Sequence, residues 1–143
     1  VTGMDMIREQ IMIAAGSPIE KTNTNITGHA IECRLNAENT AKNFMPTTGT
    51  IKALRLPGGP GSRVDTHLFP GCSISSFYDP LLVKLIAHHT TRNGALRRMS
   101  RMLEETTIEG IITNKDLLLR LLKNDQFLAG NGDTSLVTQL LDK

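Results

Sequence analysis

Apolar and polar side chains alternate along residues 29–35, and this period of two is typical of a half-buried strand. One face is expected to carry His29, Ile31, Cys33 and Leu35, and the other Ala30, Glu32, Arg34 and Asn36. Because successive side chains of a strand point to opposite faces, Arg34 is expected to point away from the apolar side. The strand leads into a polar stretch that ends at Glu38.

Helical patterns occur at the start of the chain and in its second half. Residues 2–15 are predicted to form a helix that begins at a capping-box-like Thr2 and Asp5, and a polar linker follows to Thr27. Residues 93–106 are predicted to form an amphipathic helix. A third helix is expected to start at Thr113 with Asp116 as its cap partner, and a last one near residue 134. The third helix is expected to bury Leu117, Leu118, Leu121 and Leu122.

Further strands are predicted between these helices. Residues 50–56 and 62–68 are expected to form a hairpin with a wide tip, because the proline and glycine residues of 57–61 force a turn between them. The apolar run 81–88 is compatible with helix or strand, and we interpret it as a helix turn that continues into a strand. A short strand is expected over 108–112.

The order of these elements predicts the fold class. Most strands precede most helices, which favours an α+β architecture: an antiparallel sheet with helices packed to one side. With 143 residues, of which 39% are hydrophobic, the chain is long enough for one compact core.

Composition narrows the classes of partner. The 16 basic and 14 acidic residues give a formal charge of +2, too small a surplus to indicate a polyanionic partner. One Tyr, four Phe and no Trp leave few side chains on which bases can stack, which disfavours single-strand nucleic-acid binding. No nucleic-acid partner is therefore expected.

Cysteines and apolar runs predict a cytoplasmic protein. Cys33 and Cys72 form no CxxC pair and follow no hydrophobic signal segment, so both are expected to be reduced thiols. The run 81–87 is interrupted by Lys84 and is too short to span a membrane, so no membrane partner is expected. The chain begins at Val1 and not at Met, which indicates a part of a longer polypeptide.

Arg34 is the first candidate for chemistry. Its guanidinium is always charged and carries a fork of donors, the properties needed to hold an anion or a developing oxyanion. Pattern alone favours a plainer interpretation, in which Arg34 is a surface residue that pairs with Glu32 or Glu38.

No metal site is predicted. His29 and Cys33 are expected on one face of their strand and Glu32 on the other, so the three cannot converge on an ion. A half-buried His29 with no ligand role is the better interpretation. His88 and His89 are neighbours and point apart on a strand.

Two other motifs have structural interpretations that we prefer. The glycines of 58–61 lack the Lys-Ser/Thr pair of a phosphate-binding loop, which favours a simple turn. The helix with Arg97, Arg98 and Arg101 is balanced by nearby glutamates, which favours a solvated face. A non-enzymatic module that binds nucleic acid or protein through this helix stays open as the alternative.

Five segments in order resemble the biotin carboxylase C-terminal domain. They are Gly28 to Glu38, Phe44-Met45-Pro46 with Thr48-Gly49, Pro57 to Arg63, Tyr78-Asp79-Pro80-Leu81-Leu82-Val83-Lys84-Leu85, and Gly110-Ile111-Ile112-Thr113-Asn114. Phe127, Gly130 and Thr134 near the end of the chain fit as well. Any one of these matches would be weak, but together they extend over more than a hundred residues.

This resemblance implies a biotin carboxylase, in which bicarbonate and Mg-ATP form carboxyphosphate, and carbon dioxide is then transferred to biotin on the biotin carboxyl carrier protein. It implies that Arg34 is catalytic and stabilises the negative charge on the ureido oxygen of biotin. It also implies that Asp79 contacts a basic residue of the N-terminal domain, and that Leu136 contacts the adenine of ATP. Arg63 and Pro60 match positions in the contact of a homodimer, where some members carry an aromatic residue in place of Pro60.

The resemblance also divides the chain. Residues 1–27 would be the end of an upstream ATP-grasp region with a linker, and residues 28–143 the C-terminal domain. The ligands of Mg-ATP and the N-terminal domain would lie upstream, so the chain alone is expected to be inactive. The segments 36–38 and 63–67 resemble the biotin carboxylase of bacterial acetyl-CoA carboxylase, an enzyme of fatty acid biosynthesis. Propionyl-CoA and pyruvate carboxylases are the alternatives.

Overall fold

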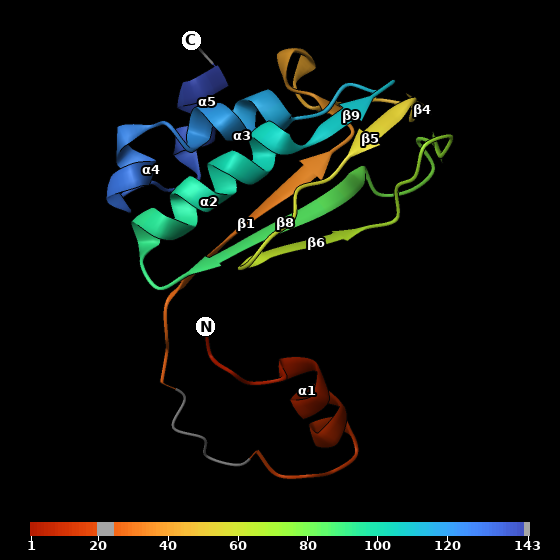
Figure 1. Ribbon diagram of the computed structural model, residues 1–143. Coiled ribbons are helices and arrows are strands. Elements are labelled where there is room, and N and C mark those ends of the chain that lie inside the picture. Colours follow the sequence, from red (N-terminus) through yellow and green to blue (C-terminus); the bar gives the residue numbers. More distant parts are fainter. Residues whose placement is uncertain (20–24, 142–143) are drawn as a thin grey trace.

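A three-stranded antiparallel sheet forms the centre of the computed structural model, which describes residues 1–19 and 25–141. Its strands are β1 (His29–Asn36), β8 (Leu81–His89) and β6 (Ser62–Thr66), in the spatial order β1-β8-β6 (Figure 1). The strand predicted over 29–35 is confirmed, and the one predicted over 62–68 is present but ends earlier. Part of the predicted linker to Thr27 lies outside the described residues.

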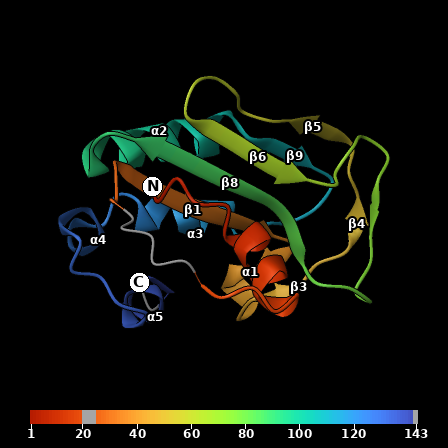
Figure 2. The same cartoon turned by 90° about the horizontal axis from the view of Figure 1, so that it is seen from below.

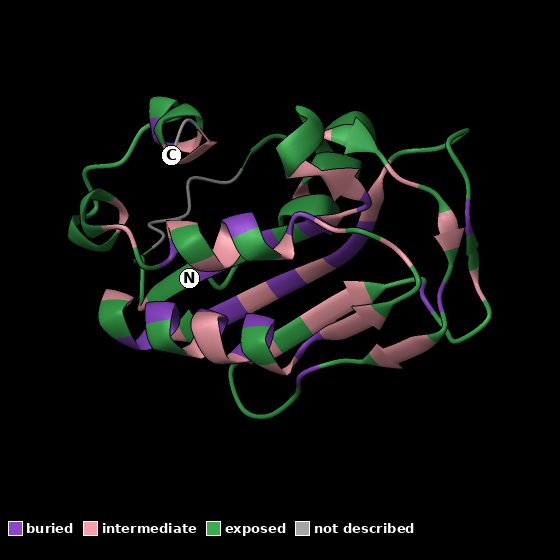
Figure 3. Cartoon of the chain, turned by 90° about the horizontal axis from the view of Figure 1, so that it is seen from above, coloured by how far each residue is buried: buried purple, intermediate pink, exposed green. Residues whose placement is uncertain are grey.

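Strand β8 corrects the interpretation of the apolar run 81–88. Val83, Leu85 and Ala87 are fully buried, whereas Lys84 and Ile86 are half-buried, so buried positions alternate along the strand (Figure 3). The predicted helix turn at the start of this run is wrong, because the ladder with β1 already begins where Leu81 pairs with Asn36. The sequence pattern of this run is compatible with helix or strand, and the pairing of β8 with β1 and β6 makes it a strand.

Six short strands form three further ladders and disprove the predicted hairpin. The pairs are β2 (Glu38–Asn39) with β3 (Met45–Pro46), β4 (Gly49–Thr50) with β7 (Ser73–Ile74), and β5 (Ala53–Arg55) with β9 (Thr107–Glu109). The strand predicted over 50–56 is split into β4 and β5, and β5 pairs with β9 while β6 pairs with β8. The turn at 57–61 therefore joins strands of different ladders. The strand predicted over 108–112 is β9 and is shorter.

Helix α1 (Met6–Ala14) starts later than predicted and lies apart from the core. Its cap is Asp5, whose Oδ1 accepts a hydrogen bond from the backbone N–H of Arg8 at 3.0 Å, while Thr2 stands outside the helix. None of its residues is buried, and Figures 1 and 2 place it on the side of the sheet opposite α2.

The other α-helices follow β8 in the chain. They are α2 (Arg92–Glu105), α3 (Lys115–Leu121), α4 (Asp125–Ala129) and α5 (Ser135–Leu141), and a short 3-10 helix spans Thr40–Lys42. The prediction missed α4, which is capped by the side chain of Asn124. The start of α3 differs from the expected cap: α3 begins after Asn114, whose side chain makes no capping bond, while Oγ1 of Thr113 accepts a hydrogen bond from the backbone N–H of Lys115 at 3.4 Å. Of the four leucines expected to be buried here, Leu117 and Leu122 are buried and the other two are half-buried.

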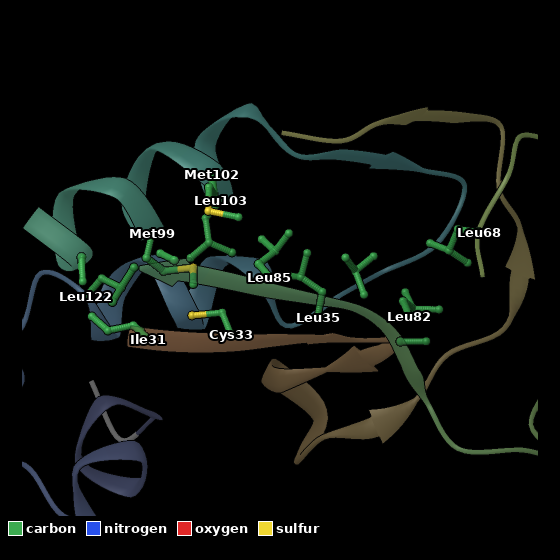
Figure 4. Packing of buried hydrophobic residues seen from close by; sticks show 14 of the residues in the cluster. Ile31, Cys33, Leu35, Leu68, Leu82, Leu85, Met99, Met102, Leu103 and Leu122 are labelled. Carbon is green, nitrogen blue, oxygen red and sulfur yellow. The ribbon is translucent and has the colours of Figure 1, made fainter. Parts of the chain in front are cut away.

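The core lies between α2 and the sheet. Met99, Met102 and Leu103 of α2 are fully buried and face Leu35 of β1 and Leu85 of β8 (Figure 4). Burial of each such side chain contributes about 1.5–3 kcal/mol to folding. Since α2 and α3 lie on the same side of the sheet, the predicted α+β class is confirmed (Figure 1).

Gly110 makes a close backbone approach that no other residue type allows. Its φ is +100°, and a Cβ at this position would lie 2.0 Å from the carbonyl oxygen of Thr50. This contact brings the segment after β9 against β4.

We predict that Gly110→Ala destabilises the chain by about 2 kcal/mol or more, because the substitution combines backbone strain with a steric clash. Urea unfolding followed by circular dichroism measures this as a lower midpoint. Gly58→Ala is the matched control, since a Cβ at Gly58 meets nothing within 4 Å, and its midpoint should stay close to that of the unsubstituted chain. Equal midpoints for both variants would contradict the prediction.

Candidate functional site

The face of the sheet that points away from α2 is charged. Cross-strand neighbours share a face, and the register sets Arg34 of β1 opposite Lys84 of β8, which is in turn opposite Asp65 of β6. The next row contains Glu32, Ile86 and Arg63. Three cations and two carboxylates therefore lie on this open face of the sheet, which we define by these two rows.

Arg34 emerges from the open face as the sequence pattern predicts. Its side chain is 65% exposed, and its Nε donates a hydrogen bond to Oε1 of Glu32 at 2.6 Å. Within residues 1–19 and 25–141 its two Nη groups have no hydrogen-bond partner, so most of the donor fork is free. The ion pair expected from pattern alone thus exists with Glu32, whereas Glu38 accepts a hydrogen bond from Asn36 at 3.2 Å.

The electrostatics keep Arg34 charged. The hydrogen bond to Glu32 and the charge of that carboxylate raise the pKa of Arg34 above its usual value, and the charge of Asp79 adds to this. Because the group stays protonated, it can stabilise a negative charge but cannot act as a base.

Asp79 lies close enough to Arg34 to act on its charge, which the sequence alone did not reveal. The Asp79 side chain is exposed, and its Oδ1 accepts a hydrogen bond from the backbone N–H of Leu81 at 2.8 Å. Among the described residues no cation forms an ion pair with it. Asp79 also lines a largely apolar cavity of about 540 Å³ whose other residues are His67, Cys72, Ser73, Ile74, Ser75, Tyr78, Leu81 and Leu82.

Arg63 and Pro60 lie at one edge of the open face. Arg63 is exposed, and its Nε donates to Oδ1 of Asp65 at 2.9 Å. This bond raises the pKa of Arg63 and lowers that of Asp65. Pro60 is exposed in the turn at 57–61. Both side chains are accessible to another molecule, and their predicted role in a dimer stays a prediction.

The basic face of α2 is mostly occupied by contacts within the chain. Nη2 of Arg101 donates to the carbonyl oxygen of Gly58 at 3.1 Å and to Oγ of Ser62 at 3.2 Å, and its Nη1 pairs with Glu105 at 2.6 Å. Arg98 donates to the carbonyl oxygen of His88. The bonds of Arg101 hold the turn at 57–61 against α2, and the bond of Arg98 connects α2 to the end of β8, so two of the three arginines of the predicted basic helix have a structural role.

Leu136 is a buried residue in the C-terminal part of the chain. It belongs to α5, which packs on α3 on the helix side of the sheet, and it is 2% exposed (Figure 1). Its predicted contact with adenine stays a prediction.

The cysteines and histidines give no sign of a metal centre. Both cysteines are free, and burial, with a smaller contribution from the charge of Glu32, raises the pKa of Cys33 to about 12. His29 is exposed and not half-buried as expected. In the described part of the chain no group of three potential ligands converges, and no helix there is both long and apolar enough to cross a bilayer.

Two residues of the site were missed by sequence reasoning. The sequence pattern marks Lys84 only as an interruption of an apolar run, although its place in the alternation puts it on the polar face beside Arg34. Asn114 belongs to a segment that matches the family and has no predicted role of its own, but its side chain is hydrogen-bonded to β1. The alternation of β8 contains the signal for Lys84. No local signal indicates the contact between Asn114 and β1, because Asn114 and Asn36 are 78 residues apart.

Comparison with known proteins supplies the family. The chain is 43% identical over 143 residues to a biotin carboxylase of Allochromatium vinosum, with 99% of this chain and 32% of the relative covered. It is 40% identical over 141 residues to a pyruvate carboxylase polypeptide of Methanothermobacter thermautotrophicus, with 97% and 29% covered.

The solved structures that resemble this chain are also biotin carboxylase domains. The biotin carboxylase domain dimer of Hydrogenobacter thermophilus 2-oxoglutarate carboxylase, in complex with MgADP, ADP and bicarbonate, superposes with a TM-score of 0.90 at 35% identity. The match covers 100% of this chain and 33% of that one, so the chain spans about a third of the length of the proteins it matches. Residues 32–139 match the family described as the biotin carboxylase C-terminal domain. The chain therefore belongs to the biotin carboxylase C-terminal domain family.

Proposed function

We propose that this chain is the C-terminal domain of a biotin carboxylase that serves acetyl-CoA carboxylase, and that Arg34 is its catalytic residue. The observation that carries the proposal is the guanidinium of Arg34, held on the open face of the sheet with both Nη groups available. Membership of the family and the order of the matching segments support it.

In the proposed reaction, carboxyphosphate formed from bicarbonate and Mg-ATP decomposes to carbon dioxide and phosphate beside biotin. The phosphate removes the ureido proton, and the ureido nitrogen then bonds to carbon dioxide. The negative charge on the ureido oxygen develops within reach of the Arg34 guanidinium, which donates hydrogen bonds to it and keeps its own protons. Glu32 holds Nε of Arg34 and so leaves the Nη end of the fork for the substrate.

The groups that bind Mg-ATP belong to the remainder of the enzyme in this proposal. The described residues contain no cluster of potential metal ligands, and the chain covers 32% of the Allochromatium vinosum enzyme. We assign residues 1–27 to the end of the ATP-grasp region and its linker, and residues 28–143 to the C-terminal domain. The exposed apolar residues of α1, among them Ile7 and Ile11, support this division, because they have no partner surface within the described domain.

The assignment to acetyl-CoA carboxylase is the finer part of the proposal. It is supported by the resemblance of residues 36–38 and 63–67, and several relatives are named biotin carboxylase with no acceptor in the name. Related chains also belong to pyruvate and 2-oxoglutarate carboxylases, and the acceptor of those enzymes does not contact this domain in the proposed reaction. The experiment that distinguishes these carboxylases combines the complete enzyme with the carboxyl-transfer component of each one and measures which acceptor is carboxylated.

We predict that Arg34→Ala in the complete enzyme lowers biotin carboxylation by roughly 10²-fold to 10³-fold, as loss of an oxyanion donor does elsewhere. ATP binding should survive, because Arg34 contacts the other substrate. Incorporation of labelled bicarbonate into biotin measures the first effect, and calorimetric titration with ATP the second. Arg55→Ala, an exposed arginine on β5, is the matched control and should keep full activity. Full carboxylation by the Arg34 variant would refute the role.

The chain of 143 residues by itself should not carboxylate biotin, since it supplies one wall of the proposed site. The measurement is carboxylation of free biotin with ATP and bicarbonate, using the complete enzyme as the positive control. Turnover by the chain alone at a rate near that of the complete enzyme would contradict this expectation.

Arg63 and Pro60 are proposed to lie in a homodimer contact of the complete enzyme. We predict that Arg63→Glu shifts the complete enzyme toward monomer, because it sets a carboxylate beside Asp65 in place of their ion pair. Sedimentation velocity measures the shift, and Arg55→Glu is the control of equal charge change. A dimer as stable in the Arg63 variant as in the unsubstituted enzyme would exclude Arg63 from the contact.

A further inference from the structure

The segment 110–114 matches the family but has no part in the proposed chemistry, and the structure sets it against the edge of β1. It connects β9 with α3. The backbone contact between Gly110 and Thr50 fixes one end of it. Farther along, Oγ1 of Thr47 donates a hydrogen bond to the carbonyl oxygen of Ile112 at 2.7 Å. The segment is therefore held in place before it reaches Asn114.

Asn114 is hydrogen-bonded to β1 at three points. Its Oδ1 accepts from the backbone N–H of Asn36 at 2.9 Å, and its Nδ2 donates to the carbonyl oxygen of Arg34 at 3.1 Å. Its own backbone N–H donates to the carbonyl oxygen of Asn36 at 3.2 Å. Asn114 is 8% exposed, so these bonds are largely shielded from water.

These three hydrogen bonds are made along the free edge of β1. β1 is an edge strand, with β8 on one side only, so every second residue of β1 presents its N–H and C=O to the free side. The ladder with β8 also shifts register between Leu35 and Asn36. Asn114 therefore takes the place of a neighbouring strand along Arg34 and Asn36.

We propose that Asn114 is a positioning residue for the carboxylation of biotin, because it fixes the backbone from which the Arg34 guanidinium projects. The inference rests on the proposed function of Arg34. A long arginine side chain reaches its target only if its Cα is held to a few tenths of an ångström, and a misplacement of about 1 Å can cost on the order of 10² in rate. A shift of the β1 edge would move Arg34 and leave the binding of ATP elsewhere unchanged.

The test uses the complete enzyme and two rates. One is carboxylation of free biotin, and the other is bicarbonate-dependent cleavage of ATP without biotin, which does not require Arg34 in the proposed reaction. Asn114→Ala should lower kcat for carboxylation on the order of 10-fold to 10²-fold, with ATP cleavage and the KM for ATP within about twofold. Asn124→Ala is the matched control, because it removes a side chain that caps α4 and makes no contact with β1.

The inference is overturned if Asn114→Ala loses both rates in proportion, loses neither, or if Asn124→Ala causes the same selective loss. If Asn114→Ala does not fold, Asn114→Asp decides instead. It keeps the acceptor for Asn36 and replaces the donor to Arg34 with an oxygen, so a selective loss of carboxylation supports the inference and unchanged carboxylation rejects it. An unsubstituted complete enzyme that carboxylates no biotin rejects the proposed function, and the role of Asn114 with it.

Discussion

The pairing of β8 with a strand on each side is the constraint on which the rest of the structure depends. Because β8 is fixed on both edges, its alternation of buried and half-buried side chains is imposed on β1 and β6 as well. Val83, Leu85 and Ala87 then make one face of the sheet that only an apolar helix can cover. The side chains of Lys84 and Ile86 point to the other face, and the side chain of Arg34 lies on that face too. A slip of one residue would bury Arg34 and expose Leu35, so the position of the candidate catalytic group and the stability of the core have the same origin.

Sequence alone predicted those elements whose signal is local. The alternation over β1 and the helical period of α2 are each contained within one element, and both were predicted, including the outward direction of Arg34. The wrong predictions share a different cause. The partner of β5 is β9, and the partner of β6 is β8, and nothing within residues 50–68 encodes either pairing, so the turn between them was interpreted as a hairpin. Similarly, the apolar run 81–88 lacks a decisive period until its two neighbours are known.

The site was predictable to a smaller extent than the fold. Pattern alone identified Arg34 as an outward residue with an acidic neighbour, and the structure has that ion pair. A catalytic role came from resemblance and not from spacing, since a surface pair and an oxyanion donor have the same local sequence. Lys84 and Asn114 reach Arg34 through strand pairing and through a contact across 80 residues, and such contacts follow from the folded topology.

The exposure of Arg34 sets a condition on its proposed catalytic role. A guanidinium that is 65% exposed interacts with an anion through a medium close to water, where a unit charge pair at 4 Å is worth about 1 kcal/mol. The stabilisation expected of an oxyanion donor is several times greater, and it requires a site from which water is excluded. For the proposed role, the open face therefore needs a second surface over Arg34 and Lys84 that excludes water. Under this proposal, a fixed backbone at Arg34 has its effect when the second surface binds, because a donor that is already held in place loses little conformational entropy.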